Sequence, residues 1–118
     1  MADLFRKVKD GLPVSGDGYD GQIITQIRAA VLDLTSSAEI VLDGTVDIER
    51  TENTPVTTSE PVTYTITDNS TIEDELVITA ITVWCNMRIG NPPNYDKLLE
   101  AYNSLKGQMR QSSKYSNF

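Results

Sequence analysis

The stretch that decides the fold is LVITAITVWCNMRI, residues 76–89, whose apolar side chains occupy nearly every side of a helix. This pattern is typical of a helix buried on most of its surface, so the segment predicts the core helix of the protein. Residues 70–73, STIE, precede it with the spacing of a capping box, and two further acids follow where the helix dipole favours negative charge. We therefore expect the helix to begin near residue 72 and to end near residue 89.

Amphipathic segments flank this core helix on both sides. One covers about residues 20–35, and its apolar face consists of Ile23, Ile24, Ile27, Ala30, Val31 and Leu34. The other covers about residues 95–110, with an apolar stripe of Tyr95, Leu98, Leu99, Tyr102, Leu105 and Met109. A shorter helix is expected from Asp3 to about Lys9, docked as an arm. The residues expected to share one core are Ile27, Val31, Ile81, Trp84, Leu98 and Tyr102.

Residues 45–67 change to a period of two, and β-forming residues are common there. Val46 and Ile48 alternate with polar residues, as do Tyr64 and Ile66, so we expect two strands joined by a long polar tip at 51–60. The predicted fold class is mainly α, a small helical bundle of three to four helices with an inserted β-hairpin at about 45–67. A chain of 118 residues can bury one core, so residues 1–118 are predicted to form a single domain.

The net charge of −7 is unevenly distributed along the chain. Residues 43–75 carry one basic and nine acidic groups, whereas residues 76–118 carry five basic and two acidic groups. A chain without a stripe of Lys and Arg is a poor candidate for gripping DNA phosphates. We interpret residues 43–70 as an acidic hairpin insertion, and its candidate contact residues are Asp47, Glu49, Glu52 and Glu60. The alternative is a solvated loop whose charge serves solubility alone.

Catalytic motifs are missing from the sequence. The chain has no histidine, which removes the commonest general base and the usual zinc ligand. We predict no enzyme activity, no metal and no cofactor; a pocket lined by Asp17, Asp20 and Glu73 would revive a carboxylate enzyme. The single Cys85 is interpreted as a small core residue. No apolar run approaches the length of a membrane span, so we expect a soluble protein made in the cytoplasm, with no membrane partner.

Two stretches resemble the head–tail connector (adaptor) proteins of tailed phages. The first is DGQIITQIRAAVLDL, residues 20–34, which is similar to the opening helix of that family. The second is ITAITVWCNMRIG, residues 78–90, which is similar to the first of the family's closing pair of helices. It is continued by YDKLL at 95–99, AY at 101–102, LK at 105–106 and SKY at 113–115, which are similar to the second closing helix and its ending. Residues 43–70 depart from the resemblance, because they are longer than the linker of many relatives.

The resemblance implies a structural virion protein of the phage neck. Such subunits form a homo-oligomeric ring, usually a dodecamer, between the portal protein and a stopper or tail-completion protein. The dsDNA passes through the ring without specific binding. In such a ring we expect the acidic hairpin to contact a neighbouring subunit or to border the channel. The alternative function is a small acidic phage protein that binds a host partner. We also predict that residues 112–118 form an extended C-terminal tail outside the subunit's own core, which docks on the portal through Lys114, Tyr115 and Phe118.

Overall fold

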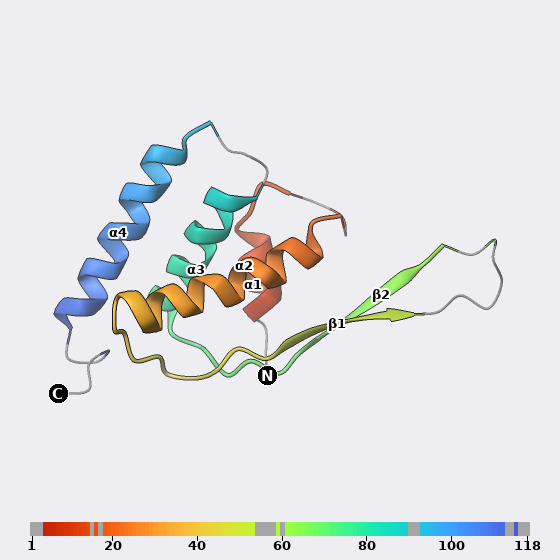
Figure 1. The fold of residues 1–118 in the computed structure, drawn as a ribbon, viewed down its shortest axis with the longest axis horizontal. Coiled ribbons are helices and arrows are strands. Elements are labelled where there is room, and N and C mark those ends of the chain that lie inside the picture. The colour runs from red at the N-terminus through yellow and green to blue at the C-terminus, as the bar shows by residue number, and fades with distance from the viewer. Residues whose placement is uncertain are drawn as a thin grey trace.

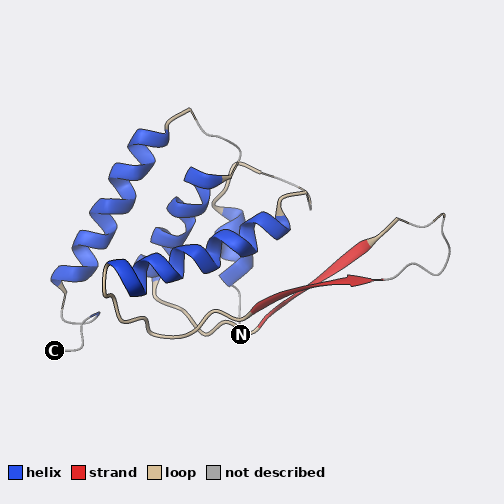
Figure 2. Cartoon of the chain, in the orientation of Figure 1, coloured by secondary structure: helices blue, strands red, loops and turns tan. Residues whose placement is uncertain are grey.

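The computed structural model describes residues 4–14, 16, 18–53, 59, 61–89, 93–112 and 115. Its helices are α1 (Leu4–Asp10), α2 (Asp20–Leu32), α3 (Glu75–Arg88) and α4 (Tyr95–Gln111), and a π-helical turn, η1 (Asp33–Ser37), prolongs α2. Strands β1 (Ile48–Asn53) and β2 (Thr63–Asp68) form an antiparallel hairpin. The predicted fold class, mainly α with an inserted hairpin, is confirmed (Figures 1 and 2).

Helix α3 lies in the middle of the helical body and contacts α1, α2 and α4. Its buried residues are Val77, Ile78, Ala80, Ile81, Cys85 and Met87. The hairpin projects from this body, as Figure 1 shows, and the described molecule measures 56 × 32 × 20 Å along its principal axes. The segment predicted as the core helix therefore has that position, and the inserted hairpin lies largely outside the core.

The first turn of α3 is capped by Asp74, and not by Ser70. The Oδ1 atom of Asp74 accepts hydrogen bonds from the main-chain N–H groups of Leu76 and Val77, at 2.9 and 3.1 Å. The hydroxyl of Ser70 instead accepts a 2.9 Å hydrogen bond from the N–H of Asp47. The capping box predicted at residues 70–73 is therefore wrong, because the chain stays extended through Asp74.

The expected core is confirmed in its centre and less complete at its margin. Ile27, Ile81 and Tyr102 are buried, whereas Val31, Trp84 and Leu98 are partly buried and pack against the core. The stripe on α4 is buried at Tyr102 and Met109 but leaves Tyr95 and Leu99 exposed at the start of the helix. Burial of the stripe therefore increases toward the carboxyl end of α4.

Trp84 lies between α2 and α4 at the margin of the core. Its Nε1–H group donates a 3.0 Å hydrogen bond to Oε1 of Gln26, and its ring packs against the ring of Tyr102 with centroids 5.2 Å apart. The guanidinium of Arg88 covers the indole at 4.2 Å from the ring centroid. The indole thus packs through its ring and still satisfies its single polar group.

The hairpin begins and ends later in the sequence than the alternation predicts. Ile48 pairs with Asp68, and Asn53 pairs with Thr63. The ladder continues toward the body, since the N–H of Asn69 donates to the carbonyl of Asp47 at 2.7 Å. In β1 only Ile48 is buried, so period-two alternation there does not mean a half-buried strand. Thr51–Asn53, predicted as part of the tip, belong to β1, and residues 54–58 and 60 lie outside the described residues.

Candidate interaction surface

The acidic residues singled out on the hairpin do not form one patch. Asp47, Glu49 and Glu52 are exposed, and Glu60 lies outside the described residues. Successive side chains of a strand point to opposite faces, so Glu49 and Glu52 lie on different faces of the hairpin. Glu49 is opposite Thr67, and Glu52 is opposite Tyr64. The hairpin therefore presents negative charge on both faces.

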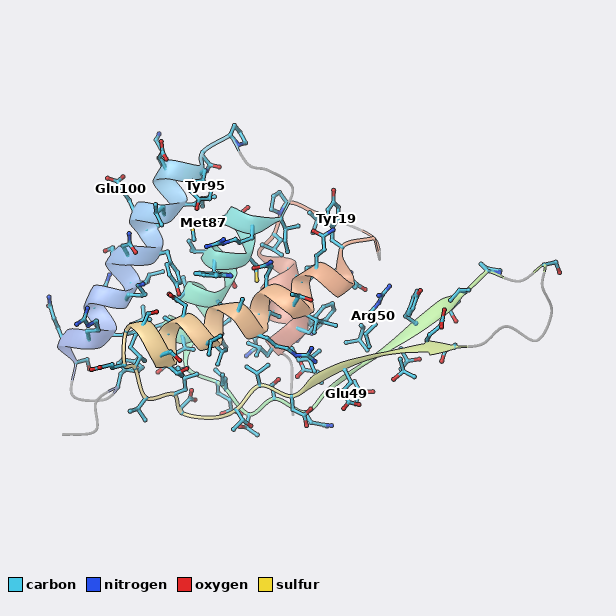
Figure 3. All side chains as sticks on the ribbon, in the orientation of Figure 1. Tyr19, Glu49, Arg50, Met87, Tyr95 and Glu100 are labelled. Carbon is cyan, nitrogen blue, oxygen red and sulfur yellow. The ribbon has the colours of Figure 1, made fainter. Side chains whose placement is uncertain are left out.

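A cation that the sequence reasoning missed stands between these acids. The guanidinium of Arg50 lies over the ring of Tyr64, 3.6 Å from its centroid, and Figure 3 shows Arg50 directed from the hairpin toward the start of α2. A Cβ atom placed on Gly21 of α2 would lie 3.1 Å from Arg50 Nη1. The pairing of Arg50 with Tyr64 could have been inferred from sequence only if the register were known, and the long tip leaves the register open.

A shallow groove of about 500 Å³ separates β1 from α2. Its lining consists of Gly21, Ile24, Thr25 and Arg28 of α2 and Glu49, Arg50 and Thr51 of β1. Three consecutive strand residues line the groove although their side chains alternate between two faces, so β1 turns its main-chain edge toward the groove. Arg28 closes the end nearest the body, where its guanidinium donates a hydrogen bond to the carbonyl of Ile48.

Comparisons with family models, curated protein sequences and solved structures find no significant match to this chain. Its likeness to phage connectors therefore stays a prediction from sequence motifs. No helix in the described part of the chain is long and apolar enough to cross a bilayer.

The C-terminal segment departs from its prediction at Tyr115, which belongs to the core of the chain itself and has a 7% exposed fraction. Its hydroxyl contacts both carboxylate oxygens of Asp74, at 2.9 and 2.8 Å, and its carbonyl accepts a 2.8 Å hydrogen bond from the N–H of Val41. The expectation of a tail outside the core is wrong for Tyr115, because its side chain packs into the core and reaches Asp74 at the start of α3. Lys114 and Phe118 lie outside the described residues.

A polar cluster joins the end of α2 to α4. The Asp33 carboxylate accepts a 2.6 Å hydrogen bond from the Tyr102 hydroxyl and a 3.2 Å ion-pair contact from Lys106 Nζ. Burial alone would raise the pKa of Asp33, but the hydrogen bonds from Tyr102 and Lys106 and the Lys106 charge outweigh it, and the pKa lies below its ordinary value. Burial, and then Asp33, raise the pKa of Tyr102. The cluster acts as a structural clamp between two helices.

Two of the remaining candidate groups for chemistry, Cys85 and Asp20, are occupied by packing and by an ion pair. Burial raises the pKa of the Cys85 thiol to about 12, so this side chain is an unreactive core residue. The carboxylate of Asp20 is buried and forms a 2.7 Å ion pair with Lys9. Glu73 is exposed, and Asp17 lies outside the described residues. Within the described ranges, no three His, Cys, Asp or Glu side chains are grouped as a metal site.

Proposed function

We propose that the chain is an adaptor subunit of a ring in the neck of a tailed phage, joining the portal to a stopper or tail component while DNA passes through. The observation that supports this most is that the two stretches similar to the connector family pack on each other. Gln26 of the first stretch binds Trp84 of the second, and Asp33 binds Tyr102. The residues that carry the resemblance thus form one interlocked helical body.

The projecting hairpin supports a role in contacts between subunits or along a channel. Its acids Glu49 and Glu52 are exposed on opposite faces, so one face can meet a neighbour while the other borders DNA. Negative charge at a channel repels phosphates and leaves nothing for DNA to bind tightly, which favours sliding. Head-to-tail rings also require unlike surfaces to meet. The chain offers an acidic block at 43–75 and a net basic segment at 76–118.

The experiment that tests this function is co-expression with the portal protein encoded in the same genome. We expect rings by electron microscopy and mass photometry, and co-purification of the chain with the portal. A Glu49→Gln, Glu52→Gln double variant should fold normally, because both side chains are exposed, and should alter DNA retention or subunit contact. Glu100→Gln, at an exposed position of α4, is the matched control. A persistent monomer that never joins purified particles would contradict the proposal and favour the host-binding alternative.

A further inference from the structure

Each outer edge of the hairpin has main-chain N–H and C=O groups that bind no other part of the described chain, and the two edges have the same number of them. In the ladder, the N–H of Asn69 donates to the carbonyl of Asp47, and the N–H of Thr71 donates to the carbonyl of Thr45. Along each strand of an antiparallel pair, the main-chain N–H and C=O groups of successive residues point alternately toward the partner strand and away from it. With the register of Ile48 opposite Asp68, the main chains of Arg50 and Glu52 therefore point outward from β1, and those of Tyr64 and Ile66 point outward from β2.

Within the described residues, no hydrogen bond reaches these four outward main-chain positions. At the body end of β1, Arg28 binds the outward carbonyl of Ile48. At the body end of β2, the N–H of Phe5 donates a 2.8 Å hydrogen bond to the side-chain carboxylate of Asp68, which brings the start of α1 beside this end of the edge. The available portion thus comprises two residues on each edge, with two N–H and two C=O groups apiece. An isolated two-stranded hairpin is marginal in water, and a bare edge is a template for another strand.

The charges around the β1 edge suit a particular incoming strand. The groove beside β1 is lined by two arginines, Arg28 and Arg50, against one acid, Glu49. The described part of the hairpin, 48–53 and 61–68, carries Glu49, Glu52 and Asp68 against Arg50 alone. A hairpin of a second copy therefore brings net negative charge to a groove with net positive charge. Its β2 edge also brings Tyr64, whose side chain is 44% exposed in the single chain.

We infer that the β2 edge of one copy pairs with the β1 edge of the next copy, so that neighbouring hairpins form a continuous antiparallel sheet. This unlike pairing uses both free edges of every hairpin, whereas pairing of β2 with β2, or of β1 with β1, leaves half of the edges bare. The contact joins two different surfaces of the chain, so the same contact can be repeated from copy to copy around an axis. The inference deepens the proposed function and rests on it for ring closure, while the edge pairing itself rests on the hairpin.

Disulfide trapping between differently tagged single variants tests which edges meet. One variant is Tyr64→Cys on β2, and the other is Glu52→Cys on β1; Arg50→Cys in its place covers a register shifted by two residues. After mixing and mild oxidation, we expect a mixed disulfide between the two variants and none within either variant alone. The parent chain, whose only thiol is the buried Cys85, is the control. A disulfide of Tyr64→Cys with itself, or no mixed disulfide at any concentration, overturns the inference.

Proline substitution supplies a second, independent test. Tyr64→Pro removes an outward N–H without removing a hydrogen bond inside the hairpin, and Tyr64→Ala is its matched control because it loses the ring and keeps that N–H. We expect Tyr64→Pro to abolish the oligomer in mass photometry and Tyr64→Ala to retain it. Circular dichroism should show the same helical content in both variants. Equal assembly of the proline and alanine variants would contradict a role for the β2 edge.

The two proposals fail in different ways. Rings that bind the portal without the mixed disulfide would leave the adaptor function standing and refute the edge pairing. A mixed disulfide in a chain that never binds the portal would support the edge pairing and refute the adaptor function.

Discussion

The hydroxyl of Tyr102 on α4 donates a 2.6 Å hydrogen bond to the carboxylate of Asp33, 69 residues earlier in the chain. This contact fixes the start of η1, directly after α2, against α4. Because the acceptor is ionised and partly buried, the bond belongs to the stronger class of side-chain hydrogen bonds. Its loss should be measurable both in stability and in the pH dependence of stability.

We expect Tyr102→Phe to lower the free energy of unfolding by about 1.5–3 kcal/mol at pH 7, because it deletes a hydrogen bond to a charged group. The folded-state pKa of Asp33 is lowered, so its contribution is complete above the unfolded pKa of about 4 and is lost as the pH falls through the folded pKa. Urea unfolding at a series of pH values should therefore show that the free energy of unfolding falls less below pH 4 in the variant than in the wild type. Tyr95→Phe, at an exposed position, is the control. Parallel pH profiles for wild type and Tyr102→Phe would refute this role.

Two glycines should respond to alanine in opposite directions. A Cβ atom on Gly44 would lie 2.6 Å from the main-chain carbon and oxygen of Thr71, so Gly44→Ala must displace the base of the hairpin and should cost about 1–3 kcal/mol. Gly107, inside α4, has no atom within 4 Å of an added Cβ, so Gly107→Ala should stabilise by about 0.5–1 kcal/mol. Thermal unfolding of both variants checks the pair. A stabilising Gly44→Ala would mean that the two segments do not approach so closely.

Trp84→Ala should cost about 3 kcal/mol, the lower end of the range for a large aromatic residue, because the indole is only partly buried. Trp84→Phe should cost less, since it keeps the packing against Tyr102 and loses the hydrogen bond to Gln26. Chemical denaturation gives both values. If the two substitutions cost the same, the hydrogen bond and not the ring packing would dominate at this position.

Truncation after Gln111 should destabilise the isolated chain, contrary to what the sequence suggests. It removes Tyr115, whose burial is worth about 1.5–3 kcal/mol, together with the bonds to Asp74 at the start of α3. Tyr115→Phe isolates the hydroxyl contribution, which we expect to be about 1.5–3 kcal/mol because its acceptor is charged. Urea unfolding distinguishes the variants, with Tyr19→Phe as an exposed control. Unchanged stability on truncation would restore the prediction of a tail outside the core.

The sequence predicts the helices of this protein well because their apolar patterns are long and unambiguous. The apolar run at 76–89 becomes α3, and the spacing of Ile23, Ile27 and Ala30 becomes the buried face of α2. Local signals of a few residues are less reliable. Ser70 has the right spacing for a cap, yet Asp74 caps the helix, because Ser70 lies in the extended chain and binds the N–H of Asp47.

The interaction surface could be predicted only in part, because it depends on contacts between distant segments. Alternation predicts that a hairpin exists, and the charge distribution predicts that it is acidic. Its register, however, decides that Arg50 lies over Tyr64. The place of Tyr115 likewise depends on where α4 ends relative to α3, and no pattern near residue 115 encodes that distance.

The burial of Cys85 makes its thiol a built-in reporter of unfolding. With no exposed fraction and a pKa raised to about 12, this single thiol reacts with a modifying reagent only in molecules whose central helix has become accessible. The rate of modification therefore counts excursions out of the folded state under native conditions. Each substitution that loosens the helical body should quicken that rate, and substitutions confined to the hairpin should leave it unchanged.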